Sequence, residues 1–239
     1  RKMDGKYYYF NGNGKLVRGW ADIDGKRYFL QQDGTMVTGW QTIDGLLYYF
    51  DASGAMAAGW TKLDGYWYYF NNEGKLMTGW MQLDGKFYYL HTDGRMVIGW
   101  QSDGTNKYYM DTVSGVMAVG WKQIDKSWYY FNQAGHMITG WLNDGGKYYY
   151  LNPKTGAKMK KRWVVYNGNY YYLDRKGVRL TGTKAVIDGK KYRFDANGIC
   201  KKKTRAEAAR QKAEQVTPET GNVTSTTEQV TPETKALSE

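Results

Sequence analysis

The sequence has few of the residues on which most small cores and catalytic sites depend. It contains one cysteine and two histidines in 239 residues, which excludes an internal disulfide framework and most zinc sites. Leucine, isoleucine, valine and phenylalanine together make 40 of the 239 residues, about 17%, a share typical of chains that do not fold. No run of about 18 apolar residues occurs, so no transmembrane helix is expected.

What the sequence has instead is a large number of aromatic rings. Its 23 tyrosines and 10 tryptophans can bury area that the aliphatic residues do not supply. The chain is therefore predicted to fold around rings rather than around aliphatic side chains. Its formal net charge of +11 weakly favours anionic or neutral polymers as partners.

An internal repeat dominates about residues 1–200. Its most regular feature is a tryptophan, usually preceded by glycine, that recurs at steps of 20, 20, 20, 20, 21, 20 and 22 residues. Each unit is numbered from this tryptophan, position n. The tryptophans at n are Trp20, Trp40, Trp60, Trp80, Trp100, Trp121, Trp141 and Trp163. A partial unit precedes them, and a ninth unit with Lys184 at n follows.

Each unit is predicted to form a β-hairpin. Asp-Gly pairs such as Asp24-Gly25 and Asp64-Gly65 are favoured where a two-residue turn needs positive φ. Aromatic and β-branched residues flank these pairs, as strands prefer. Because a lone hairpin is marginal in water, units of this kind must stack on one another. The predicted fold class is an all-β solenoid of stacked β-hairpins built from repeats of about 20 residues.

The alternation of side chains along a strand divides each hairpin into two faces. With the turn at n+4 and n+5, one face contains n, n+2, n+7 and n+9, and the other contains n+1, n+3, n+8 and n+10. The second face is steadily apolar at n+3, n+8 and n+10, and it is assigned to the core. Position n+7 varies from Arg27 to Trp67. It is therefore predicted to be a half-exposed groove position, where some units have a ligand site and others do not.

These residues resemble the choline-binding, or cell-wall-binding, repeats of Gram-positive surface proteins. The shared features are Gly-Trp, Trp-Tyr-Tyr and Gly-x-Met at matching spacing, clearest in residues 59–80 and 120–141. The resemblance implies stacked hairpins with shallow sites between them, lined by about three aromatic residues and often a methionine. Such sites hold the choline of teichoic acids. Related glucan-binding repeats bind sugars with a similar unit, so an α-glucan ligand stays open.

The family's sites, transferred to this sequence, give a set of candidate residues. A full site needs tryptophan at n, an aromatic residue at n+7 and an aromatic residue from the next hairpin. Because n+9 lies on the same hairpin face as n, this third ring is placed at n+9 of the next unit, with n+8 as the alternative. The best candidates are Trp60, Trp67 and Tyr89, and Trp121, Trp128 and Tyr150. The weaker candidates are Trp80, Phe87 and Tyr109, and Trp141, Tyr148 and Tyr172.

The chemistry of such a site fits either of two ligands. A quaternary ammonium has no hydrogen to donate and is held by ring faces. A sugar also stacks on ring faces, but needs polar partners for its hydroxyl groups. Arg27, Leu47 and Lys107 stand at n+7 where the family has a ring. These departures reduce the number of expected sites and keep sugar binding open.

A methionine series precedes the repeat tryptophans. It is interpreted as packing between hairpins, with lining of a ligand site as the alternative. The series comprises Met36, Met56, Met96, Met117, Met137 and Met159. Cys200 takes the same place in the last unit and is interpreted as a small apolar filler. Packing between hairpins is also the alternative role for each tryptophan at n.

Residues 201–239 differ in composition from the repeats. No aromatic residue follows Phe194. A capping-box pattern from Thr204 to Glu207 predicts a short polar helix ending near Gln215. The motif EQVTPET then occurs at 214–220 and 228–234, which is typical of a disordered linker. Residues 1–200 are therefore expected to form the solenoid and 201–239 a polar tail, with further domains in a longer parent protein.

The sequence as a whole predicts a noncatalytic binding module. Its acidic residues lie at turns of separate repeats and not as paired carboxylates in a cleft, so no catalytic residue is expected. The predicted role is to anchor a secreted bacterial protein at the cell surface, through choline-bearing teichoic acid. The alternatives are an α-glucan-binding module of a carbohydrate-active enzyme and an adhesin stalk that binds host protein. No cofactor, metal ion or nucleic-acid partner is expected.

Overall fold

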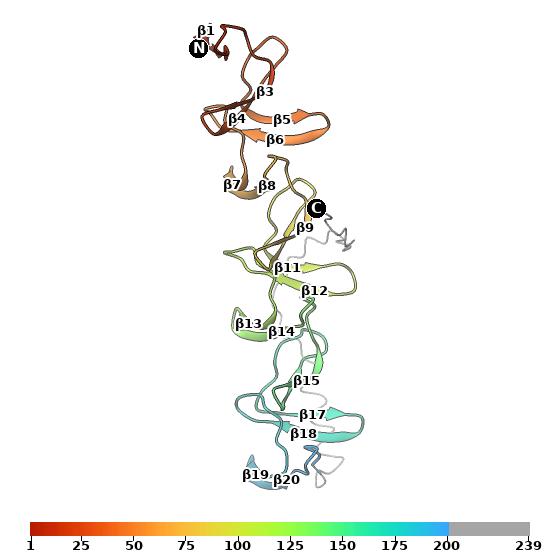
Figure 1. The fold of residues 1–239 in the computed structure, drawn as a ribbon. Helices are drawn as coiled ribbons and strands as arrows, with labels where there is room; N and C mark the ends of the chain where they lie inside the picture. The colour runs from red at the N-terminus through yellow and green to blue at the C-terminus, as the bar shows by residue number, and fades with distance from the viewer. Residues whose placement is uncertain (201–239) are drawn as a thin grey trace. The chain divides into compact units, whose positions relative to one another are not determined.

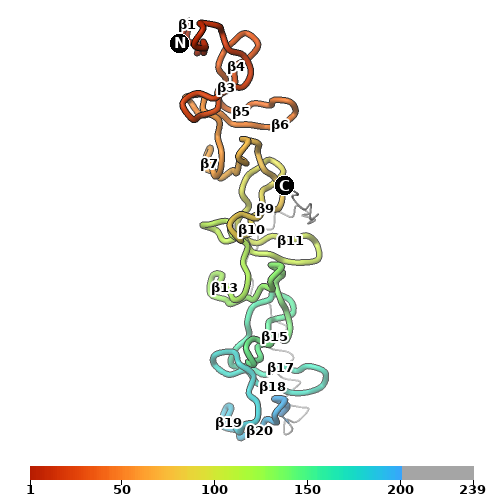
Figure 2. Tube along the Cα trace, viewed as in Figure 1, coloured from red at the N-terminus to blue at the C-terminus, as the bar shows by residue number. Residues whose placement is uncertain are grey.

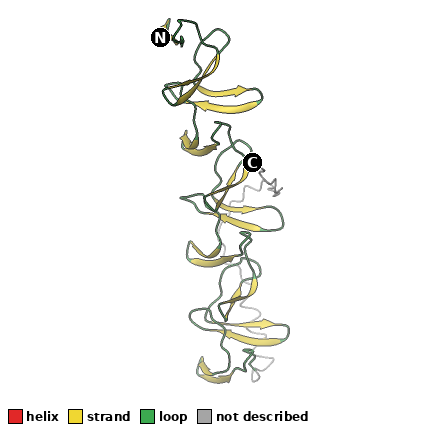
Figure 3. Cartoon of the chain, in the orientation of Figure 1, coloured by secondary structure: helices red, strands yellow, loops and turns green. Residues whose placement is uncertain are grey.

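The structure is a computed structural model, and it describes residues 1–200 (Figure 1). These residues form twenty strands and no helix (Figure 3). Consecutive strands pair into ten two-stranded sheets. This is the all-β arrangement of successive hairpins that the repeat predicts. The proposed polar helix and linker of 201–239 lie outside the described residues.

The strands follow the repeat along the whole described chain. Their bounds are β1 (Lys2–Met3), β2 (Lys6–Tyr7), β3 (Gly19–Ile23), β4 (Lys26–Leu30), β5 (Gly39–Ile43), β6 (Leu46–Phe50), β7 (Gly59–Leu63), β8 (Tyr66–Phe70), β9 (Gly79–Leu83), β10 (Lys86–Leu90), β11 (Gly99–Ser102), β12 (Lys107–Met110), β13 (Gly120–Ile124), β14 (Ser127–Phe131), β15 (Gly140–Asp144), β16 (Lys147–Leu151), β17 (Arg162–Tyr166), β18 (Asn169–Leu173), β19 (Lys184–Ile187) and β20 (Lys190–Arg193).

The hairpin turns have the conformation that the Asp-Gly pairs predict. In the turn between β7 and β8, φ is 49° at Asp64 and 86° at Gly65. Positive φ at both central residues matches the twist of the turn to that of the strands. The register follows from this short turn, with Trp60 opposite Tyr69. The predicted pairing of n with n+9 is confirmed.

The two faces of each hairpin differ in burial as the alternation predicts. On the core face, the n+10 side chains Phe50, Phe70 and Phe131 are fully buried. On the opposite face, the n+7 side chains of Trp67 and Trp128 keep 39% and 41% of their surface exposed. Position n+7 is therefore accessible in these hairpins, while n+10 supplies the core.

Backbone hydrogen bonds join each hairpin to the segment that follows the next one. The N–H of Met96, which follows β10, donates to the carbonyl oxygen of Trp67 on β8, at 2.7 Å. The same bond joins Met56 to Arg27 and Met137 to Lys107, at 2.8 Å each. The residue at the methionine position follows one hairpin and is thus hydrogen-bonded to n+7 of the hairpin preceding that one. Figure 2 lets the reader follow the chain from hairpin to hairpin.

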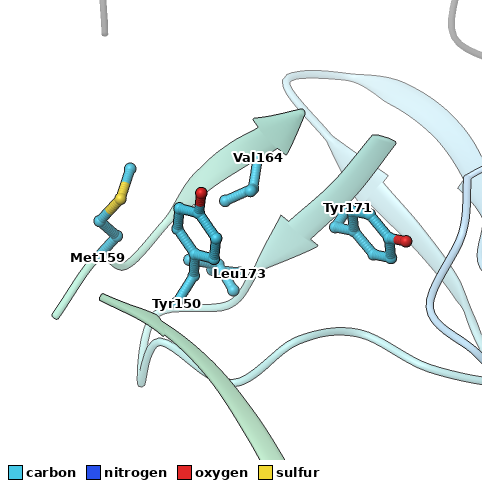
Figure 4. Close-up of a cluster of buried hydrophobic side chains, with 5 residues drawn as sticks. All are labelled: Tyr150, Met159, Val164, Tyr171 and Leu173. Carbon is cyan, nitrogen blue, oxygen red and sulfur yellow. The ribbon is translucent and has the colours of Figure 1, made fainter. Parts of the chain in front are cut away.

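The described residues divide into two compact units. The first comprises residues 1–99 and 110–117, and the second contains 100–109 together with the described residues from 118 onward. Each unit has small ring-rich core clusters of its own. In the second unit, Tyr150, Met159, Val164, Tyr171 and Leu173 form one of them (Figure 4). Among residues 1–200, no helix is long and apolar enough to cross a bilayer.

Two glycines of the second unit distinguish the cost of a left-handed backbone from the cost of steric crowding. Gly168 has φ +73 and open space where a side chain would begin. Gly177 has φ +83, and an added Cβ would lie 2.8 Å from the carbonyl oxygen of Met159. Gly168→Ala should cost about 1–2 kcal/mol through the left-handed conformation alone. Gly177→Ala should cost about 1–3 kcal/mol more, because backbone must move. Denaturant unfolding of the two variants checks this, and equal losses would contradict it.

Candidate functional site

Within one compact unit, a repeat tryptophan lies between two successive hairpins. The ring centroid of Trp60 is 5.2 Å from Tyr69 of its own hairpin and 5.0 Å from Tyr88 of the next. These are positions n+9 of the same unit and n+8 of the following one. The same pair of contacts is made by Trp20, Trp40, Trp100, Trp121, Trp141 and Trp163.

These contacts correct the expected origin of the third ring. The aromatic residue of the next hairpin that meets the tryptophan is n+8, and not n+9. Tyr89, Tyr109, Tyr150 and Tyr172 instead contact the tryptophans of their own hairpins, at 4.9–5.2 Å. The reason is the way in which hairpins stack, since the n face of one hairpin packs on the core face of the next. The alternation of side chains within a single hairpin therefore predicts the wrong contact residue in the next hairpin.

Four positions consequently lie at a junction between two hairpins of the same compact unit, and together they are called a repeat site. They are the tryptophan at n, the residue at n+7, the n+8 residue of the next hairpin, and the residue at the methionine position after that hairpin. The last is held there by its hydrogen bond to the n+7 carbonyl oxygen. Ring faces and a soft side chain are thus brought together at one place.

The first unit contains a repeat site with three rings and a methionine: Trp60, Trp67, Tyr88 and Met96. Trp60 and Met96 pack against the core cluster that contains Tyr88. Trp67 is 39% exposed, so one side of the site is open to solvent. The only charged group over a ring of this site, within the described residues, is the Lys62 ammonium, 6.0 Å from the Trp67 ring.

The second unit contains the corresponding rings Trp121, Trp128 and Tyr149, but with Lys158 at the methionine position. The Nζ atom of Lys158 lies 5.1 Å from the Trp121 ring, 5.8 Å from Trp128 and 5.5 Å from Tyr149. Burial lowers the pKa of the Lys158 ammonium, and the charge of a neighbouring lysine lowers it further. The Trp121 indole N–H also donates to the Asp144 carboxylate, at 2.8 Å. This repeat site therefore surrounds an ammonium group with three rings.

The next repeat site of the second unit follows the same plan with a guanidinium group. Its rings are Trp141, Tyr148 and Tyr171, and Arg179 takes the methionine position. The Arg179 Cζ atom lies 5.2 Å, 3.9 Å and 5.7 Å from these three ring centroids, respectively. A cation within about 6 Å of a ring face is attracted by the ring quadrupole. The ring geometry of both repeat sites is thus suited to positive charge.

Comparison with known proteins agrees with this geometry. A family described as a choline-binding repeat matches residues 17–58, 37–78, 57–93, 77–120 and 118–163. The chain belongs to the choline-binding repeat family. A second family, described as a cell wall binding repeat, matches residues 2–16 and 161–178. Among curated proteins, none matches the chain.

Solved structures of choline-binding proteins share the fold. CbpJ from Streptococcus pneumoniae TIGR4 is 28% identical with a TM-score of 0.64, over 84% of this chain and 92% of CbpJ. Choline binding protein F from Streptococcus pneumoniae is 29% identical with a TM-score of 0.61, over 83% and 90%. The choline-binding domain of CbpL from the same species is 30% identical with a TM-score of 0.54, over 79% and 99%.

Three of the remaining choline-binding repeats have no ring at n+7. Arg27 stands at n+7 beside Trp20, with its Cζ atom 5.3 Å from the ring. Leu47 takes the n+7 place beside Trp40, and Lys107 takes it beside Trp100. Of the candidates Trp80, Phe87 and Tyr109, the first two belong to the first unit and Tyr109 to the second.

The tryptophan of the last full repeat is a packing residue. Trp163 is 3% exposed and belongs to a core cluster with Tyr192 and Phe194. For this tryptophan the structure favours packing between hairpins over ligand contact. Within residues 1–200, no group of three His, Cys, Asp or Glu side chains lies close enough to hold a metal ion.

The structure also corrects one member of the methionine series. Lys158, and not Met159, occupies the methionine position of its repeat, since Lys158 forms the bridge to Leu151 and bonds to the Trp128 carbonyl oxygen. Met159 is 8% exposed in the core cluster of Figure 4. Cys200 does take the methionine position, bridged to Phe194, and it is 3% exposed. The interpretation of Cys200 as a buried filler is consistent with this placement.

Proposed function

We propose that the chain is a noncatalytic module that anchors a secreted bacterial protein to choline-bearing teichoic acid of the cell wall. The repeat sites between hairpins are aromatic cages, and the trimethylammonium group of choline is their ligand. In this role the module needs no cofactor or metal ion. The membership of the chain in the choline-binding repeat family supports the ligand class.

One observation supports a cationic ligand above all others. In the repeat site of Trp121, Trp128 and Tyr149, the Lys158 ammonium lies over all three rings. Rings at this spacing therefore hold a positively charged nitrogen group. The repeat site of Trp60, Trp67, Tyr88 and Met96 has the same ring positions, with methionine in place of the lysine. A quaternary ammonium from outside the chain is the matching ligand there.

A repetitive polymer is the partner that best suits such sites. Each cage is shallow and open on one side, so a single choline group is bound weakly. An array gains by multivalency when several choline groups belong to one chain, because later binding events are intramolecular. The solved structure of choline binding protein F in the presence of a peptidoglycan analogue supports a cell-wall setting for the relatives of this chain.

Retention on two resins tests the proposal. The chain should be retained on a resin with immobilised choline and eluted by free choline, and it should pass through a dextran resin. Its formal net charge is +11, so simple ion exchange would repel it from the cationic choline groups. Retention on choline therefore reports the cages. Retention on dextran alone would support the α-glucan alternative, and passage through both resins would favour a stalk without either ligand.

A further inference from the structure

We propose that Lys158 and Arg179 are built-in ligands that close two aromatic cages of the second unit, so that choline binds elsewhere on the chain. This inference rests on the proposed function and deepens it. It assigns to these two cations the role of specificity-determining residues. The number of choline sites is then smaller than the number of ring clusters.

The backbone holds the two cations at the same position of the repeat. Lys158 N–H donates to the Trp128 carbonyl oxygen at 2.7 Å, and Arg179 N–H donates to that of Tyr148 at 2.8 Å. Met96 makes the same bond to Trp67, at 2.7 Å. The backbone therefore delivers all three side chains to the same place in their repeat sites. The fourth side chain changes from a neutral thioether to a cation, while n+7 keeps an aromatic ring in all three repeat sites.

The two cations are surrounded by aromatic rings and not by carboxylates. Each lies within 6 Å of three aromatic ring centroids. Among residues 1–200, neither forms an ion pair with a carboxylate. The Arg179 Nε atom is buried and has no hydrogen-bond partner in that part of the chain. The rings are thus the main favourable contacts of both charges, and choline would need the same ring faces.

Competition between the two ligands favours the one that belongs to the chain. A tethered group acts at an effective concentration on the order of millimolar or more, and the backbone bond places it directly at the rings. A choline cation would have to displace it and would also be repelled by it. The cage of Trp60, Trp67 and Tyr88 has no such group at its fourth position, and it stays open.

A site-resolved titration tests the inference. The indole N–H signals of the intact chain are followed by two-dimensional NMR during addition of choline chloride, with sodium chloride as the ionic-strength control. Trp60→Ala, Trp67→Ala, Trp121→Ala and Trp128→Ala identify the signals by their loss. In the unmodified chain, the signals of Trp60 and Trp67 should shift, and those of Trp121 and Trp128 should not.

Replacing the lysine should open the cage. In Lys158→Met, the signals of Trp121 and Trp128 should also shift, and binding should rise by one choline per chain. Lys158→Leu offers the same test with the side chain that Leu76 places at this position in the first unit. Lys160→Met is the matched control, because it removes an exposed neighbouring charge without clearing the rings. Arg179→Met should open the second cage, seen at Trp141.

The outcomes separate this inference from the proposed function. Choline shifts at Trp121 and Trp128 in the unmodified chain would overturn the inference and leave the function standing. So would shifts confined to Trp60 and Trp67 in a folded Lys158→Met protein. The absence of any choline-dependent signal in every variant would overturn the proposed function and the inference together. An opening by Lys160→Met equal to that by Lys158→Met would show that net charge, and not cage occupancy, is responsible.

Discussion

Replacing Trp67 with alanine should remove the choline site of the first unit and leave the fold intact. Trp67 keeps 39% of its surface exposed, so its removal forfeits less buried area than the loss of a core ring such as Phe70. Its backbone carbonyl oxygen still accepts the hydrogen bond from Met96. The cage loses one of three walls, which is worth about 0.5–2 kcal/mol of cation–π attraction. At that site choline should bind about 2- to 30-fold more weakly, as judged by equilibrium titration.

Leu47→Ala is the matched control for this prediction. Leu47 occupies n+7 of the neighbouring hairpin and is 38% exposed, but it contributes no ring. Its replacement should leave choline binding unchanged and should lower the melting temperature no more than Trp67→Ala does. If Trp67→Ala instead lowers the melting temperature while choline binding persists at full stoichiometry, Trp67 is a packing residue and the cage assignment is wrong.

Replacing Phe70 with alanine should destabilise the first unit strongly. Phe70 is fully buried at n+10, and its ring centroid lies 5.8 Å from Trp40 of the preceding hairpin. Truncation of a buried phenylalanine costs about 3–5 kcal/mol, because apolar transfer energy is lost and a cavity is left. The measurement is the free energy of unfolding of the chain in denaturant.

Phe87→Ala provides the comparison within the same unit and with the same change of side chain. Phe87 stands at n+7 and is 38% exposed, so its loss should cost about 1 kcal/mol, well below the loss for Phe70→Ala. A similar loss for Phe70→Ala and Phe87→Ala would contradict the assignment of n+10 to the core and of n+7 to the open face.

The features that sequence reasoning predicted correctly are local to one hairpin. The Asp-Gly pairs predicted the turns, and turn length determined the register that places Trp60 opposite Tyr69. Register then assigned each side chain to a face, since a shift of one residue would exchange the two faces. Burial of Phe50 and exposure of Trp67 follow directly. All of this depends on residues within about ten positions of one another.

Contacts between hairpins could not be predicted in the same way. Tyr89 was expected to be the ring of the next hairpin that contacts Trp60, but Tyr88 makes this contact. The alternation of side chains within each hairpin does not determine how one hairpin is rotated relative to the next. The choice of Met159 over Lys158 failed because the loop after β16 is longer than in most repeats. In the structure, the Met159 thioether is buried and the Lys158 ammonium lies over the rings.

The repeat period, the turns and the face of each ring were therefore already present in the amino-acid order, because a two-residue turn and strand alternation leave no other register. The composition of each repeat site came from packing. Stacking the n face of one hairpin on the core face of the next brings together residues about 20 to 40 positions apart. That stacking is what places Lys158 and Arg179 over rings that the sequence pattern alone assigned to an external ligand.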